Sequence, residues 1–185
     1  MTEFEKMQKG QPYRPVDEEL TQFRYAAKRL CQSFNTFDPA DLDQQDIALT
    51  KLFASKGQDL VIEAPFYCQY GMNVDVGDNV IIGSNCSMVD SAHIQIGNNV
   101  RIGPDVKIYT VTQSLLPTEI KNGEQEIALP VVIGNDVLID GGCIIRAGTA
   151  IGAGAVIHSG SVLEDDVAPF DIVSGNPAKV IGRLR

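Results

Sequence analysis

Few side chains in this sequence could carry acid–base or metal chemistry at neutral pH. The chain has two histidines, His93 and His158, and lacks the His-rich spacing that a zinc site of three imidazoles requires. We therefore expect no metal. His93 could approach a groove and act as a general base, whereas His158 is most simply an exposed side chain.

Three carboxylates form a second set of candidate bases: Glu119, Glu124 and Glu126. All three lie in one stretch of mixed polarity, residues 110–130, and this location is the argument for them. A solvated acidic surface is the alternative interpretation.

A six-residue repeat must position these groups. From Val131 onward an aliphatic residue returns every six positions, at Ile133, Ile139, Ile145, Ile151, Ile157 and Leu163. One short strand and one turn per hexapeptide bring the chain back to its starting azimuth after about 18 residues, so that coils stack at the strand spacing of about 4.8 Å. The repeat predicts a left-handed parallel β-helix, and the protein should be mainly β.

The corners and the interruption of the repeat give further expectations. The residue after each aliphatic should take the tight corner, which suits Gly134 and Gly152 and is less usual for Asp140, Arg146 and His158. Upstream, the same rhythm is expected at Ala64, Tyr70, Val76, Ile82 and Met88, with two residues inserted around Ser91. We expect four to five coils, interrupted by a projecting loop, residues 110–130, of a length that is typical of function.

The four cysteines, Cys31, Cys68, Cys86 and Cys143, show no CxxC spacing. The last three fall two positions before a repeat aliphatic, where side chains face the interior. We interpret them as small apolar fillers without a redox or metal role.

Residues 1–57 are predicted to form a helical cap, and residues 58–185 the β-helix with its loop and a C-terminal tail. After a polar, extended lead-in to Pro15, one helix should run from Asp17 to about Asn35, with an apolar stripe at Leu20, Phe23, Ala27, Leu30, Cys31 and Phe34. A second should start at an N-cap, Asp38, and end at Gly57. A solenoid needs such a cap because its terminal coil presents unpaired strand edges.

Composition narrows the possible partners and compartment. The net charge is −9 and the chain has no Lys/Arg cluster, which argues against nucleic acid. No apolar stretch approaches the ~18 residues of a membrane span, and the first thirty residues contain no apolar signal region. We expect a cytoplasmic protein without membrane contact.

The sequence resembles the maltose and galactoside O-acetyltransferase family of hexapeptide acyltransferases along essentially its whole length. The segments that carry the resemblance are Glu5-Lys-Met with Gly10 and Tyr13, Leu52-Phe-Ala-Ser-Lys-Gly57, Ile62-Glu-Ala-Pro-Phe66, Tyr70-Gly71, Asn85-Cys-Ser-Met-Val-Asp90, Lys121-Asn-Gly-Glu124 and Gly175-Asn-Pro-Ala178. The resemblance implies a homotrimer with active sites between neighbouring β-helices, acetyl-CoA as the acetyl donor and a small-molecule acceptor, a sugar or an amine.

The resemblance also implies roles for individual residues. The family's catalytic histidine corresponds to Gln113, and Asn85 is the second catalytic position. Acceptor binding is implied for Arg24, Asn85 and Asp90, and cofactor binding for Gly141, Ser159 and Lys179. Surface charge or corner hydrogen bonding is the alternative interpretation of the acceptor-side residues.

The chain departs from the family pattern at positions that matter for chemistry. A glutamine amide cannot accept the acceptor's proton, and loss of a general base costs typically 10²- to 10⁴-fold in rate. Gly83 stands where the family has an asparagine, Leu138 where it has a tryptophan, and Glu164-Asp165 where it has a Thr-Lys pair beside the cofactor. Arg146 could replace that lysine, or could be ordinary surface charge.

Two hypotheses follow. The first is an acetyl-CoA-dependent acetyltransferase with an altered acceptor, for example an amine, which needs less help from a base when it arrives deprotonated. The second is a catalytically silent relative that serves as a binding protein or a trimeric scaffold.

Overall fold

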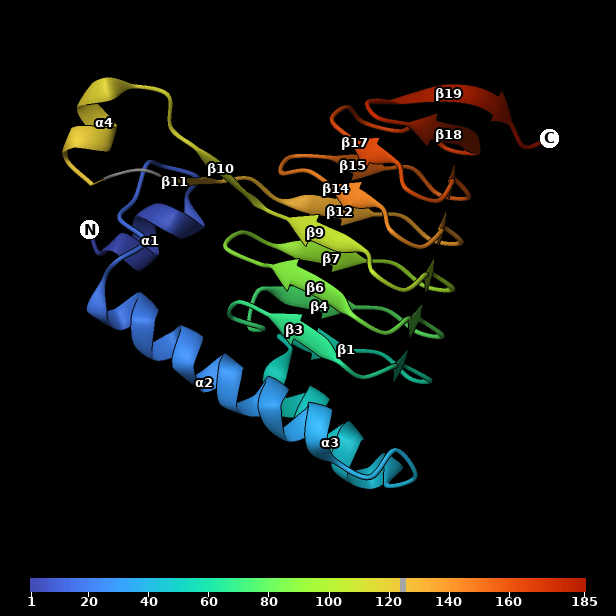
Figure 1. Cartoon of the computed structure of the whole chain (residues 1–185), viewed down its shortest axis with the longest axis horizontal. Helices are drawn as coiled ribbons and strands as arrows, with labels where there is room; N and C mark the ends of the chain where they lie inside the picture. Colours follow the sequence, from blue (N-terminus) through green and yellow to red (C-terminus); the bar gives the residue numbers. More distant parts are fainter. Residues whose placement is uncertain (124–125) are drawn as a thin grey trace.

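Three parallel sheets form the faces of a prism, with helices packed across one end (Figure 1). The structure is a computed structural model, and it describes residues 1–123 and 126–185. The first face consists of β1 (Ser55–Lys56), β4 (Val74–Val76), β7 (Ile94–Ile96), β12 (Val131–Ile133) and β15 (Ala150–Ile151). The predicted left-handed parallel β-helix is confirmed.

The second and third faces follow the same winding. The second face consists of β2 (Val61–Ile62), β5 (Ile81–Ile82), β8 (Arg101–Ile102), β13 (Leu138–Ile139), β16 (Val156–Ile157), β18 (Asp171–Gly175) and the antiparallel β19 (Ala178–Arg183). The third face consists of β3 (Phe66–Cys68), β6 (Cys86–Val89), β9 (Lys107–Tyr109), β14 (Ile144–Ile145) and β17 (Val162–Leu163). The six parallel strands of the second face correspond to about six turns, which is more than the four to five expected.

The corners between faces define three edges of the prism. The glycine edge joins the first face to the second and contains residues 57–60, 77–79, 97–99, 134–136 and 152–154. The Asn85 edge joins the second face to the third, at residues 63–65, 83–85, 103–105, 140–142 and 158–160. The loop edge joins the third face to the first, at residues 69–73, 90–93, 110–130, 146–149 and 164–166.

The expected phase of the repeat is wrong in the first coil. Ala64 is exposed, and the side chains that face the interior there are Ile62, Phe66 and Cys68. Tyr70 is buried, but outside the prism, in a separate cluster with Met7, Tyr13, Leu20, Ala92 and Ala128. The reason is that the first coil carries an insertion at the loop edge like the one predicted around Ser91, so the register pairs Ile62 with Ile82, twenty residues on.

The corner chemistry also differs from expectation. The left-handed backbone lies three positions after the inward aliphatic, at residues such as Asn99 (φ 58°) and Gly154 (φ 70°), and not one position after it. At Gly134 a side chain is excluded for another reason: a Cβ would lie 2.7 Å from the backbone nitrogen of Ala153 in the next coil. Close stacking of coils, and not a positive φ, requires the glycine.

The cap has three helices: α1 (Glu3–Gln8), α2 (Glu18–Thr36) and α3 (Leu42–Leu52). The sequence analysis missed α1, whose N-terminus is stabilised by a capping box between Thr2 and Glu5. The second predicted helix starts later than expected, because Asp41 and not Asp38 caps it, and ends at Leu52 because Ala54 and Gly57 donate backbone hydrogen bonds to the first face.

The apolar stripe predicted for the first long helix is confirmed in α2, where Leu20, Ala27, Cys31 and Phe34 are buried. Its cysteine contacts another: the Cys31 and Cys68 sulfurs lie 3.6 Å apart and join α2 to β3. All four cysteines are free and buried. The burial of Cys68, Cys86 and Cys143 agrees with the prediction that they fill interior space, but the prediction omits the contact of Cys68 with Cys31.

Candidate functional site

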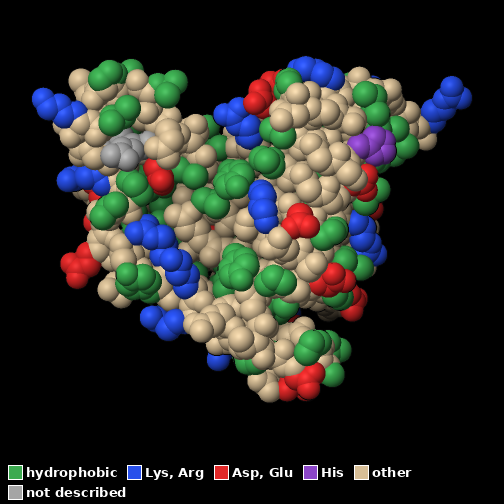
Figure 2. Space-filling view, in the orientation of Figure 1, with side chains coloured by type: hydrophobic (Ala, Val, Ile, Leu, Met, Phe, Trp, Pro, Cys, Tyr) green, Lys and Arg blue, Asp and Glu red, His purple; other side chains and the backbone are tan. Residues whose placement is uncertain are grey.

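The segment between β9 and β12 leaves the loop edge as an antiparallel hairpin. It consists of β10 (Val111–Gln113), the short helix α4 (Pro117–Lys121) and β11 (Glu126–Ala128), and it stands apart from the C-terminal coils, with an open notch between them (Figures 1 and 2). Gln113 and Glu126 are direct partners in this ladder. Gln113 therefore has a carboxylate as its neighbour.

Tyr13 makes two hydrogen bonds to Glu126, one of them to its carboxylate. Its hydroxyl donates to Glu126 Oε2 at 2.5 Å, and its backbone N–H donates to the Glu126 carbonyl at 3.0 Å. Tyr13 is completely buried. Burial and the hydrogen bond to Glu126 both raise the pKa of Tyr13, so the phenol keeps its proton and acts as a donor.

Arg24 reaches the same edge from α2. Its guanidinium donates to the Tyr70 hydroxyl at 2.9 Å and lies over the Tyr70 ring, 5.9 Å from the centroid. Burial raises the pKa of Tyr70; the Arg24 cation opposes this rise and the Glu126 carboxylate adds to it. Arg24 and Gln113, far apart in the sequence, thus belong to one neighbourhood around Glu126.

Asp90 lies in the second-coil corner of the loop edge and is fully buried. Its Oδ1 accepts hydrogen bonds from the backbone N–H groups of Gln69 (2.9 Å) and Tyr70 (2.8 Å). Its Oδ2 has no partner among the residues that the structure describes. Burial raises the pKa of Asp90 to about 6, against the backbone hydrogen bonds that lower it. In this chain Asp90 holds the corner; acceptor binding by it stays a prediction.

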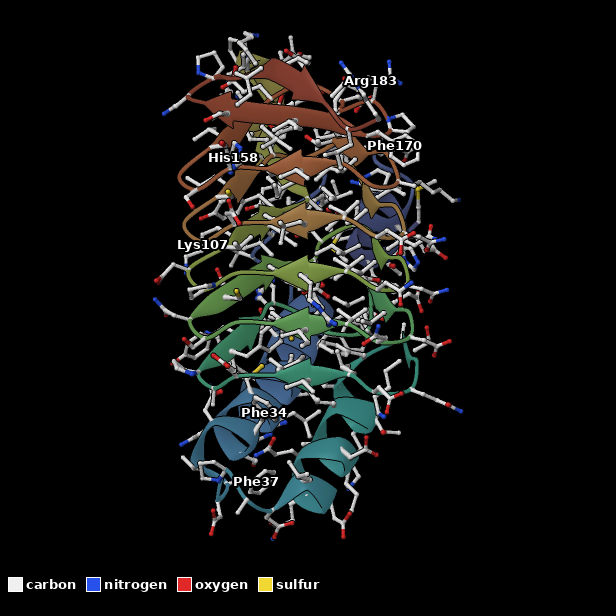
Figure 3. All side chains as sticks on the ribbon, turned by 90° about the vertical axis from the view of Figure 1, so that its right-hand side faces the viewer. Phe34, Phe37, Lys107, His158, Phe170 and Arg183 are labelled. Carbon is white, nitrogen blue, oxygen red and sulfur yellow. The ribbon has the colours of Figure 1, made fainter. Side chains whose placement is uncertain are left out.

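Asn85 lies on the other edge. It adopts the left-handed conformation (φ 60°) and donates through Nδ2 to Asp105 one coil away, and Lys107 Nζ donates to its carbonyl at 2.6 Å. Gly141 and Ser159 belong to the same edge, where Gly160 N–H donates to the Gly141 carbonyl at 3.0 Å. Lys107 and His158 mark this edge in Figure 3. The structure thus aligns Asn85 with two of the predicted cofactor residues.

Lys179 comes near this edge through the C-terminal hairpin. It pairs with Ser174 across β18 and β19, and the next residue of β18, Gly175, donates to the Ser161 hydroxyl at 3.2 Å. Lys179 Nζ lies 3.6 Å from Asp165, and Arg146 bonds Glu164 at 2.7 Å. Glu164 and Asp165 therefore each face a cation.

The other candidate bases that the structure describes have partners of their own, as Glu126 has in Tyr13. Glu119 accepts a hydrogen bond from the Ser114 hydroxyl, and Glu124 lies outside the described residues. His93 Nε2 contacts Asp75 at 2.5 Å and His158 Nδ1 contacts Asp140 at 3.3 Å, both partly exposed. Within residues 1–123 and 126–185, no group of three or more His, Cys, Asp or Glu side chains could hold a metal ion.

The predicted site residues therefore divide between two edges. Gln113, Arg24 and Asp90 lie at the loop edge, whereas Asn85, Gly141 and Ser159 lie at the Asn85 edge, across the third face. Leu138, on the second face, is partly exposed beside Arg101. Sequence reasoning missed the roles of Tyr13 and Tyr70, because no periodicity links them to a hairpin so much later in the chain.

Comparisons with known proteins cover both the cap and the repeats. Residues 6–57 match the family described as maltose acetyltransferase hexapeptide capping motif, and residues 130–165 match bacterial transferase hexapeptide (six repeats). The galactoside O-acetyltransferase of Escherichia coli (strain K12) is 30% identical over 180 residues, which cover 97% of this chain and 88% of that protein.

Two solved structures are similar over all of this chain. A maltose O-acetyltransferase from Clostridium difficile 630 has a TM-score of 0.96 and 37% identity, and 98% of that chain is covered. A hexapeptide-repeat-containing acetyltransferase from Vibrio cholerae O1 biovar eltor, complexed with acetyl coenzyme A, has a TM-score of 0.90 and 34% identity, and 100% of that chain is covered. In the described part of the present chain, no helix is both long and apolar enough to cross a membrane.

Proposed function

Because the chain belongs to the hexapeptide-repeat acetyltransferase family that includes the maltose and galactoside O-acetyltransferases, we propose that it transfers the acetyl group of acetyl-CoA to a hydroxyl or amine of a small-molecule acceptor. Asn85 and Gln113 line the acceptor site. Gln113 orients the acceptor through its amide, since it cannot take a proton itself.

The observation that carries this proposal is the separation of the site residues onto two edges. Asn85, Gly141 and Ser159 lie at one edge of the prism, and Gln113 and Arg24 at another. An acceptor that touches both Asn85 and Gln113 must then lie between two chains, where the Asn85 edge of one meets the loop edge of its neighbour. A homotrimer supplies that junction three times.

The Asn85 edge is also suited to acetyl-CoA. Gly141 adds no side chain to it, and Ser159 is exposed there, so a long ligand can lie along the edge. Glu164 and Asp165 lie at the loop edge, which a neighbouring chain would bring to this junction, and there they would repel the cofactor's phosphates, but their contacts with Arg146 and Lys179 offset that charge. Lys179, which is largely exposed, can turn from Asp165 to a phosphate at little cost.

Calorimetric titration tests whether the protein binds acetyl-CoA, and light scattering tests whether it is a trimer. We expect saturable binding, about one site per chain, and a mass near three times the 20.0 kDa of one chain. A mass near 20.0 kDa would contradict the trimer. Neither transfer nor hydrolysis of acetyl-CoA in the presence of sugar and amine acceptors would favour the catalytically silent alternative.

A further inference from the structure

The hairpin offers a carboxylate where the family offers an imidazole. Side chains of directly opposed residues in an antiparallel pair point to the same face, with Cβ atoms about 4.5–5.5 Å apart. Gln113 and Glu126 are such a pair. A group bound at the Gln113 amide is therefore within reach of the Glu126 side chain.

The carboxylate of Glu126 is both fixed and available. Tyr13 donates to Oε2 at 2.5 Å from a fully buried position, which restricts the side chain to one orientation. Among the described residues no other group bonds this carboxylate and no cation pairs with it. The second oxygen, Oε1, is therefore left to accept a hydrogen bond from a bound acceptor.

Resting on the function proposed above, we propose that Glu126 is the general base of this enzyme, positioned by Tyr13, with Gln113 orienting the acceptor. The acceptor's oxygen or nitrogen attacks the thioester carbonyl carbon while its proton passes to Glu126 Oε1. The carbon–sulfur bond then breaks, the acetyl group stays on the acceptor, and the departing thiolate takes the proton back from Glu126 to leave as the free thiol of CoA.

The test compares isosteric variants on hydroxyl acceptors, with maltose and a galactoside as probes and release of free CoA thiol as the readout. Glu126→Gln can still accept the Tyr13 hydrogen bond through its amide oxygen, so we expect it to fold. Its kcat should fall 10²- to 10⁴-fold, with the calorimetric affinity for acetyl-CoA unchanged. Glu119→Gln, on the same loop, is the matched control and should stay within about threefold of the wild type.

Three further results decide between explanations. Restoring an imidazole, Gln113→His, should recover activity in the Glu126→Gln background. Full activity of Glu126→Gln would overturn the role of Glu126 and leave the proposed function intact. The same holds if His93→Asn, and not Glu126→Gln, loses activity. No turnover by the wild type with any acceptor, amines included, would overturn the proposed function as well.

The thiol pair between cap and β-helix carries a second, independent inference. Cys31 of α2 and Cys68 of β3 have their sulfurs 3.6 Å apart and line an open cavity of about 440 Å³ with Lys28, Asn35 and Tyr67. The hydrogen bond between the two thiols lowers the pKa of Cys31 and, together with burial, raises that of Cys68, and burial also raises the pKa of Cys86 and Cys143. We infer that Cys31 and Cys68 are a modification site that low-molecular-weight disulfides oxidise to an intramolecular disulfide.

Oxidation of the two cysteines proceeds by thiol–disulfide exchange. The Cys31 thiolate attacks a sulfur of the small disulfide and releases one small thiolate, and Cys68 then displaces the second small thiol from the mixed disulfide. Two thiols lose two protons and two electrons, and the small disulfide is reduced to two thiols. The two sulfurs must approach from 3.6 Å to the about 2.05 Å of a disulfide bond.

Mass spectrometry of the native protein after incubation with oxidised glutathione tests this inference. We expect one Cys31–Cys68 cross-linked peptide, with Cys86 and Cys143 still thiols as internal controls, and a raised melting temperature. Cys31→Ser should abolish the cross-link without changing the fold. Stable glutathionylation without a cross-link, or four free thiols after incubation, would overturn it.

Discussion

The loop edge and the Asn85 edge of this β-helix carry the two halves of one candidate site, but they are built in opposite ways. At the Asn85 edge the second to fifth coils each place a short residue in the left-handed conformation, and partners such as Asn85 and Asp105 stack on one another in water. At the loop edge, Tyr13, Tyr70, Asp90 and Glu126 come from the cap, two coils and the hairpin, and three of them are buried. One edge follows from a local repeat, and the other from long-range packing.

The largest loss of stability should follow from a substitution at the buried centre of the loop edge. Tyr13→Ala deletes a fully buried ring and its hydrogen bond to Glu126, so the free energy of unfolding should fall by about 3–5 kcal/mol. Urea denaturation measures this. Tyr13→Phe keeps the ring and should lose only about 1 kcal/mol, and an equal loss in both variants would show that packing of the ring is unimportant.

The buried acid of the loop edge should make stability depend on pH. The pKa of Asp90 rises from its ordinary 3.8 to about 6 in the folded state, so the folded chain binds its proton more tightly than the unfolded chain does. Stability due to this group is therefore present at low pH and is lost as the pH rises from about 4 to 6. Between pH 4 and pH 7, the free energy of unfolding of Asp90→Asn should rise by about 2 kcal/mol relative to that of the wild type. Urea denaturation at both pH values measures this change. Parallel pH curves for the two proteins would contradict the assignment.

At the Asn85 edge the backbone conformation should matter more than the side chain. Asn85→Ala puts at φ 60° a residue that tolerates the left-handed conformation less well than asparagine does, at a cost of about 1 kcal/mol, and it also loses the bond to Asp105. Asn85→Gly loses the same bond without strain and should be the more stable of the two variants. Thermal unfolding of both decides this, and a more stable alanine variant would refute it.

The smallest effect is expected from the exposed ion pairs. Arg146→Gln breaks a 2.7 Å contact with Glu164 between half-exposed side chains, so stability should change by no more than about 0.5 kcal/mol. Affinity for acetyl-CoA, measured by calorimetry, should nevertheless fall, because Glu164 is then uncompensated near an anionic ligand. Unchanged affinity would place the cofactor away from this pair.

The parts of the fold that repeat were predictable, and the exceptions have identifiable causes. The α2 stripe, the coils from Val131 onward and the projecting loop were all expected from spacing. The phase of the first coil was not, because its inserted residues carry Tyr70 into a second cluster. The helix α1 was missed because its single buried residue, Met7, gives no periodic signal.

By itself the sequence determined the β-helix, the identity of the family, and the absence of an imidazole at Gln113. These depend on local rules, since each hexapeptide dictates its own strand and corner. Only the tertiary structure decided which of three loop acids stands beside Gln113, and that Asn85 lies on a different edge. The contact from Tyr13 to Glu126 joins residues 113 positions apart, and the hairpin register sets Gln113 opposite Glu126; such pairings depend on packing that no local pattern encodes.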